Sequence, residues 1–201
     1  MHKEFSGFGD QAVVTMQSNV TVPEGMGIEG FYEVVCRDAD GNVKWEEKFP
    51  NLVVAVGKQL MLDTLLSGSS YTTVGPYLGL ISGTGNTFAA ADTMSSHAGW
   101  TEFTPYTVGG SAVRGTASFS SASSSGLSPS NVTTKSAAAI TYTITGGGGT
   151  VGGCFLVTGA GASSTISNTA GTLYSAGAFA TAKITTAGDT VSVTYSTTAT
   201  S

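Results

Sequence analysis

The sequence predicts a mainly β protein, an antiparallel sandwich or barrel with one short helix and an extended N-terminal arm. Thr, Gly, Ser and Ala supply 105 of the 201 residues, a composition that disfavours helices. Glycine costs a helix interior about 1 kcal/mol relative to alanine, whereas Thr, Val, Tyr and Phe suit half-buried strands. Short strand-like segments recur roughly every 8 to 14 residues between Gly- and Ser-rich turns, as in sandwiches and barrels. A chain of this length can bury a sizeable core without disulfides or metals.

Residues 1–26 are predicted to form the arm, and residues 27–201 a single β domain. Large apolar side chains in the arm stand between Gly, Ser and Gln residues, and Pro23 marks its end. These side chains are Phe5, Phe8, Val13, Val14 and Met16. Because they need an apolar surface, we expect them to bury against the body or a neighbouring subunit.

Residues 30–49 form the clearest hairpin. Two β-rich stretches, 30–37 and 43–49, flank a five-residue linker of Asp, Ala, Gly and Asn. Acidic and amide residues alternate in the linker as they do in a calcium loop, but the Gly and Glu positions of such a loop do not match. We therefore expect a plain turn.

Charged side chains occupy one face of the second hairpin strand. Lys44, Glu46 and Lys48 alternate there with Val43, Trp45 and Glu47. Successive strand residues point to opposite faces, so one face should be solvated or turned toward a partner. We expect these three charged residues and the apolar arm residues to form the interface of the protein.

The only convincing helix lies within residues 51–66, and we place it at about 55–66. Its leucines and Met61 give a broad apolar face, and the following Ser-Gly pair is a suitable stop. A short helical turn is expected at residues 89–96. Later strands are expected at residues 77–81, 112–119, 139–145, 151–158, 172–179, 182–186 and 191–195.

The net charge is confined to the first third of the chain. Residues 1–63 hold ten acidic and five basic side chains, whereas the remaining 138 residues hold three of each. The whole net charge of −5 therefore belongs to the arm, the hairpin and the helix. A body this neutral is either packed against partners or kept soluble by hydroxyl groups. Without a Lys/Arg cluster, the sequence also predicts no direct contact with nucleic acid or membrane.

The sequence offers few residues for catalysis. It lacks the common hydrolase, metalloprotease and nucleotide-binding motifs, and we expect no enzyme, catalytic residue, cofactor or metal. A triad of His97, Asp92 and a serine is conceivable, but we favour a loop histidine near Trp100. Cys36 and Cys154 are interpreted as buried small hydrophobes, with a bridge between them left open.

Two further features concern location and ligands. The first eleven residues lack the apolar segment of a secretory signal, which predicts synthesis and assembly in a cytoplasm. A β-sandwich rich in Gly, Ser and Thr could also bind carbohydrate through stacked aromatic rings, although core packing is their commoner role. The candidate rings are Tyr71, Tyr77, Trp100 and Tyr106.

Five stretches carry a resemblance to a known class of proteins. They are residues 38–51, 51–66, 90–102, 171–177 and 187–195. Together they resemble small virion structural proteins of tailed bacteriophages, of the kind that decorate or cement the icosahedral head. The resemblance spans roughly residues 31–197. It implies a β-sandwich, often jelly-roll-like, that forms homotrimers at three-fold positions of the shell and has no catalytic residues.

We therefore expect a non-enzymatic capsid decoration, or cement, protein. It would be made in the host bacterial cytoplasm, bind the major capsid protein on the outside of the head, and stabilise capsomer boundaries. Two alternatives remain: a tail or fibre component of the virion, and a carbohydrate-binding adhesin module.

Overall fold

The computed structural model describes residues 27–66, 74–120, 123–124, 133–136 and 138–200. This part of the chain is mainly β, as predicted, with thirteen strands and one helix. The elements are β1 (Gly27–Arg37), β2 (Val43–Pro50), β3 (Leu52–Val53), α1 (Ala55–Leu66), β4 (Tyr77–Ser82), β5 (Thr101–Glu102), β6 (Tyr106–Thr107), β7 (Gly115–Thr116), β8 (Ser123–Ser124), β9 (Thr133–Ser136), β10 (Ile140–Ile144), β11 (Gly149–Thr158), β12 (Thr172–Thr185) and β13 (Thr190–Thr200). The predicted arm, residues 1–26, lies outside the described residues.

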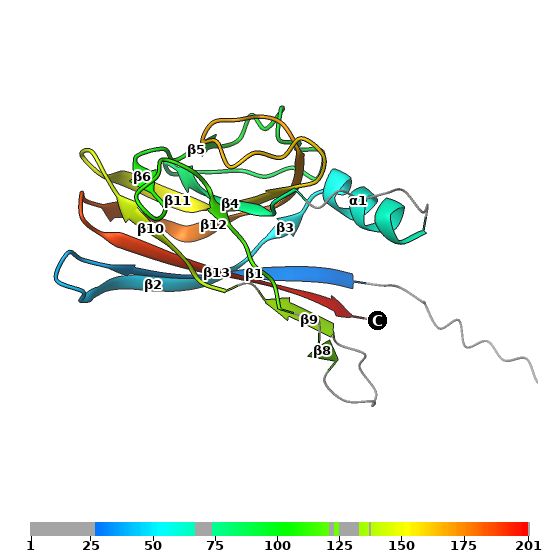
Figure 1. Cartoon of the computed structure of the whole chain (residues 1–201), viewed down its shortest axis with the longest axis horizontal. Helices are drawn as coiled ribbons and strands as arrows, with labels where there is room; N and C mark the ends of the chain where they lie inside the picture. The colour runs from blue at the N-terminus through cyan, green and yellow to red at the C-terminus, as the bar shows by residue number, and fades with distance from the viewer. Residues whose placement is uncertain (1–26, 67–73, 121–122, 125–132, 137, 201) are drawn as a thin grey trace, which may run out of the picture.

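The strands form two antiparallel sheets that pack as a sandwich (Figure 1). The first sheet has the order β2-β1-β13-β10-β6, and β9 and β8 extend it beside β13. The second sheet has the order β3-β12-β11-β4-β5, with β7 paired to β4. The predicted sandwich is therefore confirmed, whereas a jelly-roll connectivity stays a prediction.

The predicted hairpin is the β1–β2 pair, and β13 flanks it on the other side. β1 pairs with β13 along its full length, from Gly27 opposite Thr200 to Arg37 opposite Thr190. In the hairpin turn, one carboxylate oxygen of Asp38 accepts the backbone N–H groups of Asp40 and Asn42 at 3.0 and 2.8 Å. This is a plain turn, as expected, because the acid binds its own backbone.

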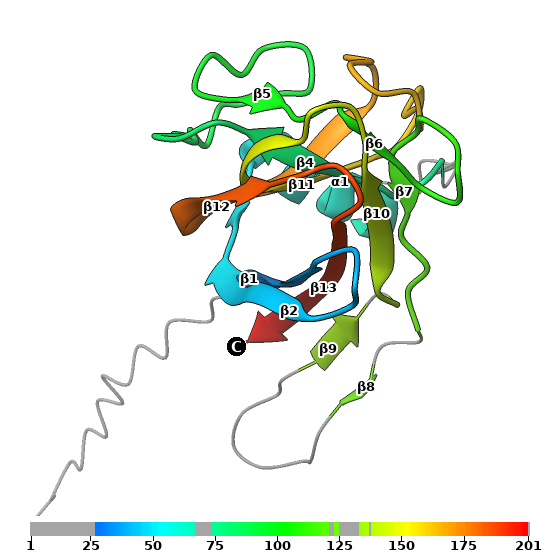
Figure 2. The same ribbon diagram turned by 90° about the vertical axis from the view of Figure 1, so that its left-hand side faces the viewer.

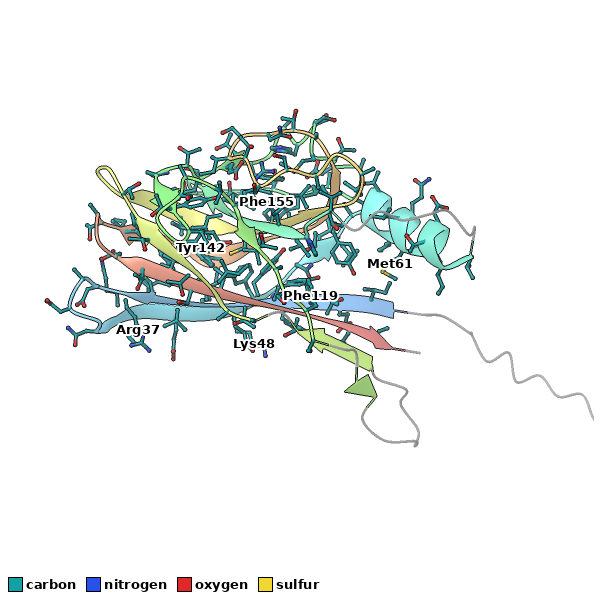
Figure 3. All side chains as sticks on the ribbon, in the orientation of Figure 1. Arg37, Lys48, Met61, Phe119, Tyr142 and Phe155 are labelled. Carbon is teal, nitrogen blue, oxygen red and sulfur yellow. The ribbon has the colours of Figure 1, made fainter. Side chains whose placement is uncertain are left out.

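The two sheets face each other in Figure 2, and buried tyrosines lie between them in the core. The ring of Tyr32 lies 5.4 Å from that of Phe49 and 4.8 Å from that of Tyr195. The Tyr142 hydroxyl, between the layers in Figure 3, donates to the Leu78 carbonyl of the opposite sheet at 2.6 Å. Each buried hydroxyl that is paired in this way avoids the cost of an unmet polar group.

A second apolar cluster lies on the other face of the second sheet. It includes Phe155, Ile81, Leu173, Met94 and Trp100, the last two from the loops that cover this face. Both faces of β11 are therefore covered, and every residue from 151 to 158 is buried. This explains why β11 reads as a continuous apolar run rather than an alternating one.

Helix α1 is confirmed, but its predicted apolar face is not part of the core. The helix touches β12 at Gly57, where a Cβ atom would stand 2.6 Å from the Tyr174 carbonyl oxygen. Beyond that contact it projects past the end of the sandwich (Figure 1). Leu65 and Leu66 are consequently 76% and 74% exposed.

Three local predictions were wrong or incomplete. Residues 89–96 form turns and a Thr93–Ser96 bridge instead of a helical turn. Within residues 112–119, only β7 is a strand. The two strands expected between residues 172 and 186 are one strand, β12, whose pairing with β11 shifts register between residues 151 and 153.

In the described part of the chain, no helix has the length and hydropathy needed to cross a bilayer.

Candidate interaction surfaces

The outer face of the hairpin carries charged side chains, as the alternation in β2 predicts. Glu46 and Lys48 are exposed, and Lys48 points away from the core in Figure 3. The Lys48 ammonium lies 2.5 Å from a Glu33 carboxylate oxygen and 5.5 Å from the centre of the Phe31 ring. Both ends of this ion pair are more than half exposed, so the pair stabilises the fold little and stays accessible to a partner.

Lys44 behaves differently from the other two predicted interface residues. The β1–β2 register shifts beside it, and its ammonium lies 2.6 Å from the carboxylate of Asp189, which is 2% exposed. Burial alone would raise the pKa of Asp189, but hydrogen bonds from Lys44 and the Thr186 backbone N–H outweigh it and lower that pKa. The hydrogen bond to Asp189 also raises the pKa of Lys44. Lys44 therefore holds the hairpin to the β12–β13 turn.

The neighbouring strands continue this outer face with hydroxyl groups. Thr141 of β10 and Ser192 of β13 face each other, with their hydroxyl oxygens 2.9 Å apart. Thr143 and Thr194 lie on the same side of the sheet, whose opposite side carries the buried tyrosines. The first sheet thus presents a charged half on β1 and β2 and a neutral, hydroxyl-covered half on β13 and β10.

Four of the six charged residues of the body, Arg114, Glu102, Asp189 and Lys183, form ion pairs that tie elements together. Arg114 is 1% exposed, and its guanidinium donates to both carboxylate oxygens of Glu102, at 2.8 and 2.7 Å. It also donates to the backbone carbonyls of Ser163 and Asn168, and Glu102 accepts the Ser167 backbone N–H. This cluster fastens the loop before β12 to the loop around β5. In a similar way, Lys183 ties β12 to β2, because its ammonium lies 3.2 Å from a Glu47 carboxylate oxygen.

The residues considered for chemistry have structural surroundings. His97 stacks on Trp100 with 3.7 Å between ring centres, and its Nδ1 lies 3.1 Å from the Trp100 carbonyl oxygen. Asp92 accepts the backbone N–H of Ala89. Trp100 and Tyr106 are buried, which confirms core packing over a role as sugar-stacking platforms; Tyr71 lies outside the described residues.

The two cysteines are buried free thiols. Burial raises the pKa of Cys36 to about 11 and that of Cys154 well above its ordinary value. Both thiols therefore stay protonated near neutral pH, which suits the predicted role as small hydrophobes. Among the described residues, no group of three or more His, Cys, Asp or Glu side chains could hold a metal ion.

The sandwich is open at the end where α1 projects. A pocket of about 620 Å³ opens there between the sheets. Its lining is Met61, Gly75, Pro76, Ala117, Phe119, Leu156, Thr158, Tyr174, Tyr195 and Thr197. A second hollow of about 500 Å³ adjoins it, since Met61 lines both. We call the surface formed by both hollows the open end. Met61 and Phe119 mark its two sides in Figure 3.

Sequence reasoning missed the open end and the Arg114 cluster. The open end is assembled from α1, β11, β12 and β13, which are far apart in the chain, so no local pattern marks it. A faint signal for the cluster existed, because the uncharged body contains so few ionic residues that each needs an explanation. The predicted arm residues Phe5, Phe8, Val13, Val14 and Met16 lie outside the described residues.

Comparisons with protein-family models, with curated proteins and with solved structures find no match.

Proposed function

We propose that this chain is a tailed-phage head decoration protein that acts by contact alone. The sequence resemblance supports the class of protein. The structural observation that carries the proposal is the use of body charges as internal ties, in the pairs Arg114–Glu102, Lys44–Asp189 and Lys183–Glu47. What remains on the outer face of β13 and β10 is neutral and rich in hydroxyls, so copies can pack side by side without charge repulsion.

The proposed mechanism is clamping across capsomer boundaries. Packaged DNA pushes outward on a shell, and area buried by a clamp opposes separation at about 25 cal/mol per Å², reduced by the cost of association. Many weak copies add up because each is held by several neighbours at once. The charged hairpin face would meet the major capsid protein, and homotrimers at three-fold positions would supply the repeated contacts.

The test is copy number and position in purified virions. Quantitative mass spectrometry should find this chain at a level comparable to that of the major capsid protein, and image reconstruction should locate it on the head. A few copies confined to the tail would favour the tail or fibre alternative. Absence from the particle would overturn the proposal in both forms.

The adhesin alternative needs a different measurement. Because Trp100 is buried, its substitution would disturb folding before it disturbed sugar binding. Glycan-array binding by the intact chain, with no detectable presence on the head, would support that alternative instead.

A further inference from the structure

The described part of the chain leaves the pocket at the open end unfilled. The 620 Å³ pocket falls in the size range of sites that bind small ligands or anchor side chains, and apolar groups dominate its lining. Next to it, Leu62, Leu65 and Leu66 of α1 are exposed. Contiguous apolar surface of this kind on a single chain usually marks a docking site.

The polar atoms of the pocket are already engaged, which restricts the chemistry of its occupant. The Tyr195 hydroxyl accepts from the Asn51 amide at 3.2 Å, and the Tyr174 hydroxyl lies 3.6 Å from the Met61 sulfur. The Thr197 hydroxyl donates to the Glu29 carbonyl oxygen at 3.1 Å. Burial raises the pKa of Tyr195 to about 12, so this hydroxyl also stays uncharged. An occupant must therefore bind through apolar contact.

Strand β1 begins at this end. Gly27 and Ile28, the first described residues, line the 500 Å³ hollow together with Met61 and Leu62. The 26 preceding residues can span roughly 80 Å when extended, several times the distance across the mouth of a pocket of this size. Within them, the stretch from Phe5 to Met16 contains a single charged residue, Asp10.

We propose that the Phe5–Met16 segment of the same chain docks in the open end and covers it. Its apolar residues (Phe5, Phe8, Val13, Val14 and Met16) match the apolar lining of the pocket. A short tether gives the segment an effective concentration in the millimolar range, so it occupies its own pocket before that of a second copy in dilute solution. This inference concerns the isolated chain and does not depend on the role in the virion.

The first test is crosslinking within the full-length chain. Val13→Cys is combined with Thr197→Cys in the pocket, or with Thr194→Cys on the outward side of the same strand as the matched control. The native thiols are fully buried and do not compete. Under mild oxidation of dilute protein, the 13–197 bond should form at least about tenfold faster than the 13–194 bond, within monomers. Equal rates, or 13–197 bonds only between copies, would overturn the proposal.

The second test measures amide hydrogen exchange in residues 5–16 of the full chain. The same amides in a synthetic peptide of residues 1–26 give the unprotected rate, and docking should slow exchange at least about tenfold below it. Met61→Glu places a charge in the pocket and should abolish the protection. Gln59→Glu, at an exposed position of α1 that lines neither hollow, should preserve it. Exchange at the peptide rate in the unmodified chain, or equal effects of the two variants, would contradict docking.

Discussion

Single residues explain how so neutral a body is held together. Arg114 and Glu102 are both almost fully buried, and the guanidinium also lies 5.1 Å from the centre of the Phe155 ring. Such a pair is costly to desolvate, and its value lies in fixing geometry once both partners and their remaining hydrogen bonds are present. Here it sets the positions of two loops that cover the second apolar cluster.

Removing one partner of this pair should destabilise the fold strongly. Arg114→Met leaves the Glu102 carboxylate buried without its counter-charge, and we expect unfolding free energy to fall by about 3–5 kcal/mol. Lys48→Met breaks the exposed pair with Glu33 and should cost less than about 1 kcal/mol. Urea unfolding at neutral pH measures both. Similar losses in the two variants would show that the buried pair is not a major tie.

The Lys44–Asp189 pair should make stability sensitive to acid. The folded-state pKa of Asp189 is lowered below its ordinary value of 3.8, so its contribution is complete above that value. The contribution is lost as pH falls through the lower, folded-state pKa. Asp189→Asn should therefore reduce stability at pH 7 and flatten the decline below about pH 4, as measured by urea unfolding at each pH. An unchanged acid profile would contradict this assignment.

At the scale of elements, local patterns predicted the type of a segment but not its partners. The β1–β2 hairpin, α1, β4, β10 and β13 follow from alternation, turn residues and apolar spacing, all of which act over a few residues. The sequence could not show that β12 is one continuous strand, because its second half is held by pairing to β11 and by Glu47 on β2. The leucines and Met61 that were expected to form an apolar face on α1 belong to neither core cluster, which only the fold shows.

The contact between α1 and β12 gives a test at this scale. Gly57→Ala improves helix propensity by about 1 kcal/mol, but the added methyl group would press on the Tyr174 carbonyl, which the strand cannot easily move. We expect a net loss of stability in thermal unfolding. Gln59→Ala, at an exposed position two residues later, should change the unfolding free energy by no more than about 0.5 kcal/mol. Stabilisation by Gly57→Ala would mean that the helix is not docked as described.

Across the whole molecule, the chain divides its polar groups by depth. Arg114, Glu102, Asp189 and Lys183 of the body are engaged in ion pairs, hydroxyls cover one half of the first sheet, and exposed charged side chains lie on the hairpin. Composition and charge counts predicted a neutral body with a charged hairpin. They could not separate Lys44, which is tied to Asp189, from Glu46 and Lys48, because that difference depends on a register shift and on a turn 145 residues away.

If the protein binds a phage head, the charged face of the hairpin is the surface to alter, because the exposed charged side chains lie there. Lys48→Glu reverses the charge at the middle of that face and places two carboxylates together, with Glu33 as the neighbour. Because both side chains are largely exposed, the fold should tolerate the change, whereas docking against a complementary surface should not. We expect normal unfolding but a severalfold lower occupancy on virions in a binding assay with purified heads lacking the protein. Gln59→Glu adds negative charge on α1, away from the face, and should bind normally. Full occupancy by Lys48→Glu would mean that this face does not contact the shell, and the contact would have to be sought at the open end or on the hydroxyl-covered half.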